Sequence, residues 1–148
     1  MIILCISGCS KPYEGRIIQV IDGDTYVFQT EEGSFIVRMQ GIDAPERDQL
    51  FSRESAEFLK RCLNKNAVTV KHGYDQYDRT LGTLFVDSIN INLLSIKGGY
   101  SWHYKRYSSS IEYARAEKYA RSRKLGLWNL KNPIAPWDWR QMEPEVAE

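Results

Sequence analysis

The segments IDGDT (residues 21–25) and RMQGIDAPE (residues 38–46) decide how the first half of this chain folds. The pair Asp22-Gly23 lies between two runs of alternating apolar residues, 17–21 and 25–28. An Asp-Gly pair between such runs is the strongest short-range signal for a β-hairpin. The pattern therefore predicts two paired strands, with Asp24 just beyond a tight turn.

The second segment follows a third alternating run, residues 35–39, which predicts another strand. Arg38, Asp43 and Glu46 lie toward the far end of this strand, and Pro45 forbids further strand pairing because it lacks a backbone N–H. We therefore expect three acids and one arginine to converge at one rim of the fold.

Two of these acids fit a site for a hard cation. Calcium prefers carboxylate and carbonyl oxygens, and Asp24 and Asp43, with a backbone carbonyl and waters, would supply them. Other interpretations hold for single residues: Asp22 and Asp24 could simply shape the turn, Arg38 could form a surface ion pair, and Glu46 could be a solvated acid at a helix start.

The composition of the 148 residues, 43% hydrophobic and 12% aromatic, predicts one compact domain with a hydrophobic core. The formal charge of +1 gives no global argument for a polyanionic partner. The distribution of charge says more, because residues 97–124 contain eight basic residues against two acids. This segment predicts a basic face on a nearly neutral protein.

Residues 1–12 are interpreted as a signal or lipoprotein-type segment, because an apolar run ends in Ile6-Ser7-Gly8-Cys9, which resembles a bacterial lipobox. The run lacks a basic region, is short for a signal peptide, and is far too short to span a bilayer. We expect export to the cell envelope or beyond, with membrane attachment through a lipidated Cys9. Cys62 would then stand alone as a small core hydrophobe.

The remaining elements complete a set of five strands and about three helices. Ser52 is expected to cap a helix over residues 52–63, and Ser109 with Glu112 predicts a capping box for a helix ending at Leu125. The other predicted elements are strands at residues 67–72 and 81–86, a short helix at 90–96, an aromatic tail at 133–140 that packs back, and an acidic tail at 141–148. This set is compatible with an α+β OB-fold, a five-stranded β-barrel, or with another small α+β fold.

Longer motifs resemble one family. VIDGDT (residues 20–25), VRMQGIDAPE (37–46), YDQYDR (74–79), GYSWHYKRY (99–107), GLW (126–128) and PIAPWDWR (133–140) are similar to segments of the staphylococcal-nuclease-like thermonucleases. The resemblance covers residues 13–140. It implies the OB-fold barrel, hydrolysis of phosphodiester bonds in DNA and RNA, and a requirement for calcium; we expect a monomer.

The resemblance also implies a role for individual residues. Asp24 and Asp43 correspond to the family's metal carboxylates, the carbonyl of Ala44 to a further metal ligand, and Glu46 to the catalytic acid. Arg38 and Arg79 correspond to its two phosphate-binding arginines, which suits the bidentate geometry of guanidinium groups.

The aromatic and histidine residues give less specific signals than the acids and arginines. Tyr77 and Tyr104 could stack on nucleotide bases, or could equally be packing residues. The four tryptophans are expected to be structural. His72 and His103 lack paired ligand spacing, so we expect no histidine metal site and at most a substrate contact from His103.

One position departs from the family pattern, because Asp78 stands where a glycine commonly precedes the second arginine. This places a carboxylate beside the expected phosphate clamp, where it could weaken binding, pair with Arg79 or only form a turn. A non-catalytic nucleic-acid-binding OB-fold module is the alternative function, and an envelope lipoprotein with an interaction role is a third.

Overall fold

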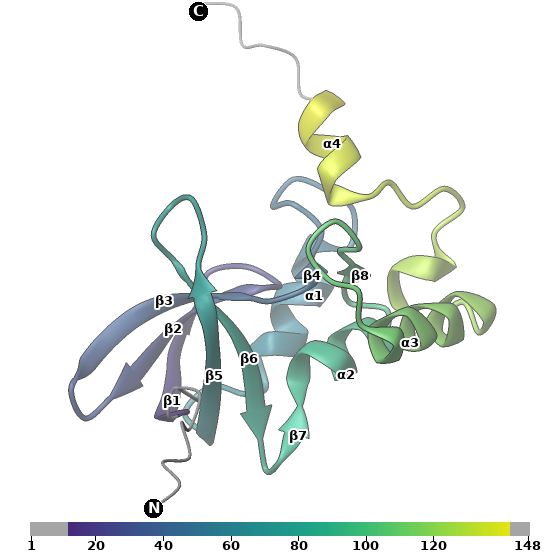
Figure 1. Cartoon of the computed structure of the whole chain (residues 1–148). Coiled ribbons are helices and arrows are strands. Elements are labelled where there is room, and N and C mark those ends of the chain that lie inside the picture. Colours follow the sequence, from purple (N-terminus) through teal and green to yellow (C-terminus); the bar gives the residue numbers. More distant parts are fainter. Residues whose placement is uncertain (1–11, 143–148) are drawn as a thin grey trace, which may run out of the picture.

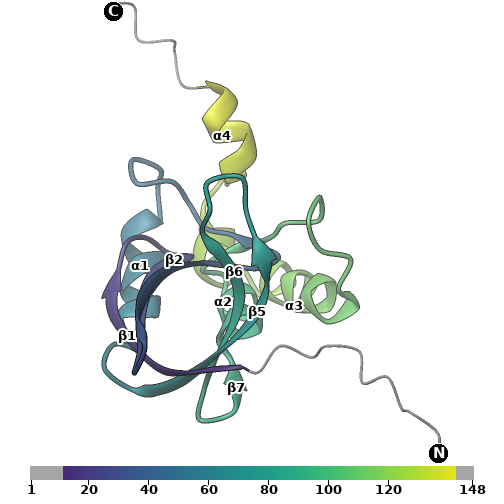
Figure 2. The ribbon, with the colours of Figure 1, turned by 60° about the vertical axis from the view of Figure 1, so that its left-hand side comes forward.

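The computed structural model describes residues 12–142, and its centre is a closed barrel of five strands (Figure 2). The barrel strands are β1 (Tyr13–Val20), β2 (Thr25–Thr30), β3 (Gly33–Met39), β5 (Asn66–Tyr74) and β6 (Thr80–Val86). Antiparallel pairs link them in the order β3-β2-β1-β5-β6, and a parallel pairing of β3 with β6 closes the ring. The predicted five-stranded OB-type α+β barrel is confirmed.

The predicted hairpin is formed by β1 and β2, which pair from Arg16 opposite Gln29 to Val20 opposite Tyr26. The turn between them packs tightly on the helix α1 (Ser52–Lys60). A Cβ atom at Gly23 would collide with the hydroxyl of Ser55 on this helix. Glycine is thus required here for close approach as much as for the turn itself.

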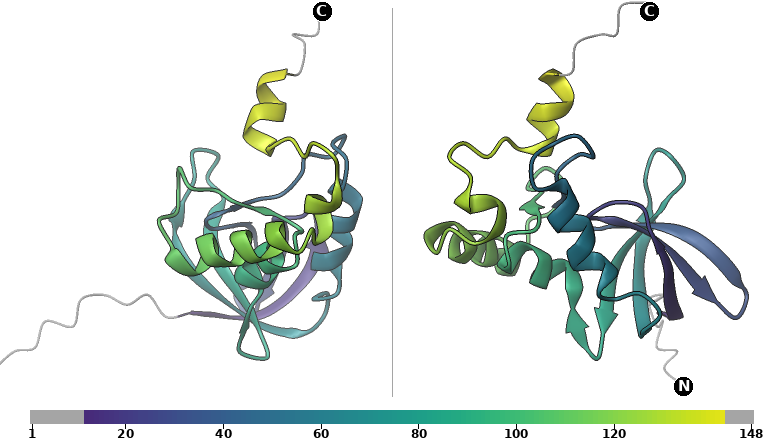
Figure 3. Two further views of the ribbon diagram at one scale, coloured as in Figure 1. Left: turned by 90° about the vertical axis from the view of Figure 1, so that its right-hand side faces the viewer. Right: turned by 180° about the vertical axis from the view of Figure 1, so that it is seen from behind.

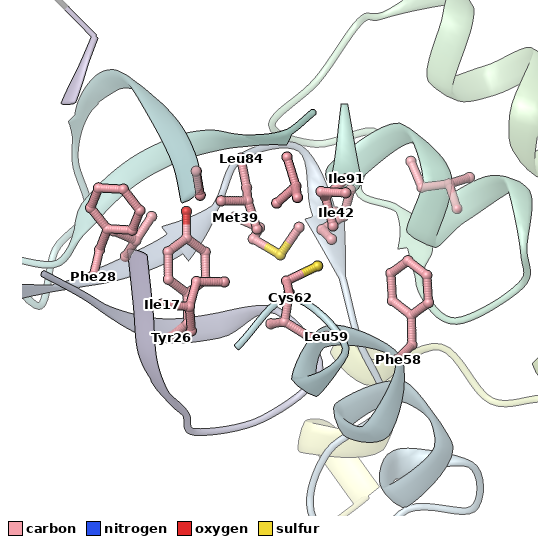
Figure 4. Close-up of a cluster of buried hydrophobic side chains, with 14 of the residues drawn as sticks. Ile17, Tyr26, Phe28, Met39, Ile42, Phe58, Leu59, Cys62, Leu84 and Ile91 are labelled. Carbon is pink, nitrogen blue, oxygen red and sulfur yellow. The ribbon is translucent and has the colours of Figure 1, made fainter. Parts of the chain in front are cut away.

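The barrel interior is filled by side chains that alternate inward along the strands (Figure 4). Ile17, Tyr26 and Phe28 are fully buried, and the Tyr26 hydroxyl is satisfied by a 3.0 Å hydrogen bond to the Thr69 hydroxyl. Cys62 is also buried in this cluster, as a small apolar side chain.

The helix α1 begins and ends differently from the prediction. Its N-cap is Phe51, in a left-handed conformation, and Ser52 instead donates its hydroxyl to the Arg47 carbonyl over 2.9 Å. The helix ends at Lys60 rather than at residue 63, and Leu63 forms an isolated bridge with Ile17. Contact with the barrel therefore overrides the helical spacing at this end.

The helix α2 (Ile91–Lys97) follows the short strand β7 (Ile89–Asn90) and agrees with the prediction for residues 90–96. The helix α3 (Ile111–Ser122) is capped by Ser110, so the predicted capping box at Ser109 is wrong by one residue. It also ends before residue 125, because Lys124 adopts a φ of +52°.

The chain continues through the 3-10 helix η1 (Gly126–Asn129) to a fourth helix, α4 (Pro136–Met142), which was not predicted. A second core, distinct from that of the barrel, anchors this region: Trp102, Ala120, Leu127, Trp128 and Ala135, with Trp137 packed against them. The predicted packing of the aromatic tail is confirmed, as is the structural role of Trp102 and Trp128, which are buried.

The helices α1, α2 and α3 gather on one side of the barrel (Figures 1 and 3), while α4 and the loop between β5 and β6 project from the same edge of the molecule (Figures 1 and 2). At this edge the two-residue strands β4 (Ile42–Asp43) and β8 (Trp102–His103) also pair. No helix among residues 12–142 is long and apolar enough to cross a bilayer.

Candidate active site

A cleft of about 650 Å³ lies at this edge, between the hairpin turn, the end of β3, the β5–β6 loop and α4. It brings together all eight site residues expected from the sequence: Asp24, Arg38, Asp43, Ala44, Glu46, Tyr77, Arg79 and Tyr104.

The two candidate metal ligands reach the cleft from separate elements. Asp24 follows the hairpin turn, and its carboxylate accepts hydrogen bonds from the Ala44 N–H at 2.6 Å and the Thr25 hydroxyl at 3.0 Å. Asp43 lies in β4, whose pairing with β8 fixes its backbone. Gly41, with a φ of +75°, makes the bend between β3 and β4 that turns Asp43 toward Asp24.

Burial and mutual repulsion shape the electrostatics of these acids. Burial, together with the charge of Asp24, raises the pKa of Asp43 to about 6. The same two causes, with burial again the larger, raise the pKa of Asp22 to about 7. The cleft thus concentrates carboxylates that favour a nearby cation.

Arg38 places a positive charge beside the carboxylates of Asp24 and Asp43. Its Nη2 lies 2.8 Å from Asp43 Oδ1 and 3.2 Å from Asp24 Oδ2, and its Nη1 donates to the Met39 and Ile42 carbonyls at 2.9 Å. Both terminal nitrogens are therefore engaged with the protein. Arg38 holds the two aspartates together in this state, rather than presenting an open fork.

Arg79 differs from Arg38 in how its guanidinium group is held. Its Nε donates to Asp75 Oδ2 at 2.7 Å, while its terminal nitrogens have no hydrogen-bond partner within residues 12–142. Asp75 also accepts from the backbone N–H groups of Tyr77 and Arg79, at 2.9 and 3.0 Å. One carboxylate thus shapes the β5–β6 turn and orients the arginine within it.

Of the three interpretations of Asp78, the structure supports the turn and not the pairing with Arg79. Asp78 does not line the cleft, and the carboxylate that pairs with Arg79 belongs to Asp75. Asp78 has a φ of +62°, a left-handed conformation that glycine adopts freely and aspartate tolerates. Glycine and aspartate can therefore both occupy this position of the turn.

We expect Asp75→Ala to lower kcat/KM at least tenfold, because Arg79 loses its orienting partner. Losing hydrogen bonds to a half-buried charged group should also cost about 1.5–3 kcal/mol of unfolding free energy. Steady-state kinetics and thermal unfolding measure both effects. Asp78→Gly is the matched control, for which we expect kcat/KM within about twofold of the parent at any salt concentration. Equal effects of the two substitutions would contradict this assignment.

The two candidate stacking residues differ in their surroundings. Tyr77 is 71% exposed and lies beside Arg79, with the guanidinium carbon 5.5 Å from its ring centre. Tyr104 stacks on Trp137 at 5.1 Å and contacts Tyr107 at 4.8 Å between ring centres. The packing interpretation therefore describes Tyr104, while Tyr77 keeps an accessible ring. His103 is buried against Ser108 and does not line the cleft, so it is no substrate contact.

Sequence reasoning missed two cleft residues of consequence, Asp75 and Arg140. Arg140, on α4, lies 2.9 Å from Asp43 Oδ2 through its Nη2, and its Nη1 pairs with Glu46. The only hint in the sequence was its place at the end of the PIAPWDWR segment, which was assigned to packing.

The described part of the chain contains no group of three or more His, Cys, Asp and Glu side chains arranged to hold a metal. A cation here would rely on the carboxylates of Asp24 and Asp43, the Ala44 carbonyl and waters. This donor set consists only of oxygen and fits a hard cation such as calcium.

Comparison with known proteins identifies the family of this chain. The family described as "Staphylococcal nuclease homologue" matches residues 36–130. A Haemophilus influenzae protein described as an uncharacterized endonuclease is 37% identical over 146 residues, which cover 97% of this chain and 82% of that protein. An Escherichia coli O157:H7 protein with the same description is 34% identical, covering 85% and 84%.

A rice protein described as the probable staphylococcal-like nuclease CAN3 is 37% identical over 106 residues, covering 71% of this chain but only 28% of the plant protein. The family match spans well over half of this chain. The chain therefore belongs to the staphylococcal nuclease homologue family.

Proposed function

We propose that this protein is a calcium-dependent nuclease that hydrolyses the phosphodiester bonds of DNA and RNA with little sequence specificity. One observation supports this most strongly. Two buried aspartates, a glutamate and an arginine with unused donors converge in one cleft, on the fold of a family described as nuclease homologues.

In the proposed mechanism, a substrate phosphate binds to the free terminal nitrogens of Arg79, whose planar fork matches two phosphate oxygens. Arg38 keeps Asp24 and Asp43 together, and these two carboxylates, with the Ala44 carbonyl, would hold calcium. Bound calcium would neutralise phosphate charge and make a water more acidic. Glu46 accepts or orients the proton of the attacking water.

An exposed basic segment of the chain suits a polyanion. All eight basic residues between positions 97 and 124 are exposed: Lys97, Lys105, Arg106, Arg115, Lys118, Arg121, Arg123 and Lys124. Of the two acids in this segment, Glu112 is exposed, whereas Glu117 is buried and pairs with Lys105 and Arg121. Contacts with phosphates are independent of sequence, which supports low specificity.

The deciding experiment incubates the purified protein with single-stranded DNA, duplex DNA and RNA of mixed sequence, in calcium or in excess chelator. We expect all three substrates to be cut in calcium, with products throughout the sequence. Absence of cleavage of every substrate under all conditions would overturn the proposal.

A non-catalytic nucleic-acid-binding module remains the second candidate. Its supporting observation is the exposed basic segment, which would bind a backbone without any chemistry. Against it stands the complete set of acids and arginines in the cleft, which binding alone would not need. Tight binding of nucleic acid without cleavage would favour this module. If the protein neither binds nor cleaves nucleic acid, the envelope lipoprotein with an interaction role would be favoured.

Export through a lipidated Cys9 is a further proposal, supported by the lipobox-like sequence; residues 1–11 lie outside the described part of the chain. Expressed in a bacterium, the protein should partition with the envelope, and Cys9→Ser should release it, because the thiol that would carry the lipid anchor is lost. Fractionation measures this. The same soluble distribution for both forms would contradict export by this route.

A further inference from the structure

The helix α4 (Pro136–Met142) contributes Arg140 to the lining of the cleft, although it lies beyond residues 36–130, where the family match ends. Packing against neighbouring side chains fixes the position of this helix. Pro136 is buried, and Trp137 stacks on Tyr104 with ring planes only 7° apart and packs edge-on against Trp102. The segment before the helix is also held, because Gln49 donates its side-chain amide to the Ile134 carbonyl.

From this helix Arg140 reaches two acids that the proposed chemistry uses differently. The two carboxylate oxygens of Asp43 pair with different arginines. Arg38 Nη2 lies 2.8 Å from Oδ1, and Arg140 Nη2 lies 2.9 Å from Oδ2. The other terminal nitrogen of Arg140 pairs with the carboxylate of Glu46. One guanidinium group therefore bridges a candidate metal ligand and the candidate general base.

Glu46 depends on this bridge for its side-chain position. Its backbone N–H is held by Gln49 Oε1 at 3.0 Å, but within residues 12–142 Arg140 is the only hydrogen-bond partner of its carboxylate. The side chain is 35% exposed, so packing alone does not restrict it. Without Arg140 the carboxylate would gain rotamer freedom and leave its place beside Asp43 for much of the time.

We propose that Arg140 is a positioning residue, which reaches from α4 to hold the Glu46 carboxylate beside Asp43. The inference rests on the proposed nuclease function, because the consequence of correct placement appears in turnover. General-base catalysis requires the base within hydrogen-bond reach of the proton that it takes. A planar fork can bridge two carboxylates, whereas the ammonium group of a lysine is a single point charge.

The bridge has a second consequence, for calcium. Arg140 places a positive charge beside Asp43, which repels an incoming cation. Removing that charge should leave calcium affinity unchanged or make it tighter, even though turnover falls. A substitution that merely disrupts the fold would weaken calcium binding and turnover together.

The test compares the parent with Arg140→Ala, Arg140→Lys and the control Arg53→Ala, which removes an exposed arginine from α1. For Arg140→Ala we expect kcat to fall about 10- to 100-fold, less than the roughly 100- to 10,000-fold contribution of a correctly placed general base, with KM within about twofold. Added guanidinium ion at millimolar concentration should restore part of kcat, and Arg140→Lys should recover less than tenfold. Arg53→Ala should match the parent.

Calorimetric titration with calcium is the readout that does not depend on activity. Calcium affinity equal to or tighter than that of the parent, in a variant that still unfolds cooperatively, is the expected result for Arg140→Ala. A kcat within twofold of the parent, or weaker calcium binding without guanidinium rescue, would overturn the inference. An inactive parent would instead refute the proposed function, and calcium binding that is tighter in Arg140→Ala but not in Arg53→Ala would still show that Arg140 acts at Asp43.

Discussion

Excess chelator is expected to reduce the cleavage of DNA and RNA by about a thousandfold or more, since a bound metal contributes several kcal/mol to stabilising the transition state. Without the cation, the buried carboxylates of Asp24 and Asp43 face the incoming phosphate with their negative charge. Arg38 and Arg140 pair with Asp24, Asp43 and also Glu46, so two positive charges face three carboxylates.

Asp24→Ala should mimic chelation, because it removes one of the two carboxylate ligands. Rates measured by release of acid-soluble nucleotides, before and after calcium is added back, provide the test. Glu14→Ala, which removes an exposed acid on β1 far from the cleft, is the control and should behave as the parent. Undiminished cleavage in chelator would refute the metal assignment, and equal rates with magnesium would contradict the preference for calcium.

Arg79→Lys should reduce kcat/KM by about a hundredfold to a thousandfold, the cost of losing one well-placed donor to developing charge. The structure explains why lysine cannot substitute. Arg79 uses its Nε to bind Asp75 and keeps both terminal nitrogens for the cleft. A single ammonium group can pair with Asp75 or bind the phosphate, but cannot hold two oxygens while doing so.

Because this loss is geometric, it should persist at every salt concentration, unlike a purely electrostatic effect that salt would screen. Kinetics between low and high ionic strength distinguish the two. Arg53→Lys on α1 is the matched control. Activity of Arg79→Lys within tenfold of the parent would mean that Arg79 contributes charge alone.

Much of the barrel could be predicted because its signals are local. The Asp22-Gly23 turn and the alternation in β1, β2 and β3 each depend on neighbours within a few residues, and all three strands form as expected. Gly23 shows the limit of such reasoning. Its preference for a turn is visible in the sequence. The need for a residue without a Cβ atom against Ser55 arises from a contact between distant segments and is not visible there.

Helix ends were predicted less well, because tertiary contacts override weak local preferences. Ser52 and Ser109 both have the chemistry of an N-cap, yet Phe51 and Ser110 occupy those positions. The helix α4 escaped prediction altogether. Its seven residues are too few for a helix to be stable alone, so packing of Pro136 and Trp137 decides that it forms.

The sequence by itself determined most of the residues of the candidate site. Residue types and short spacings pointed to Asp24, Arg38, Asp43 and Glu46, and the family resemblance added Ala44 and Arg79. These six, with Tyr77 and Tyr104, share one cleft. Only the tertiary structure decided which partner each of them has. Arg79 pairs with Asp75 rather than with Asp78, because the left-handed turn at Asp78 leaves the Asp75 carboxylate beside the guanidinium group. Arg140 reaches Asp43 across 97 positions of sequence, a contact that exists only because the second core folds α4 back onto the rim of the barrel.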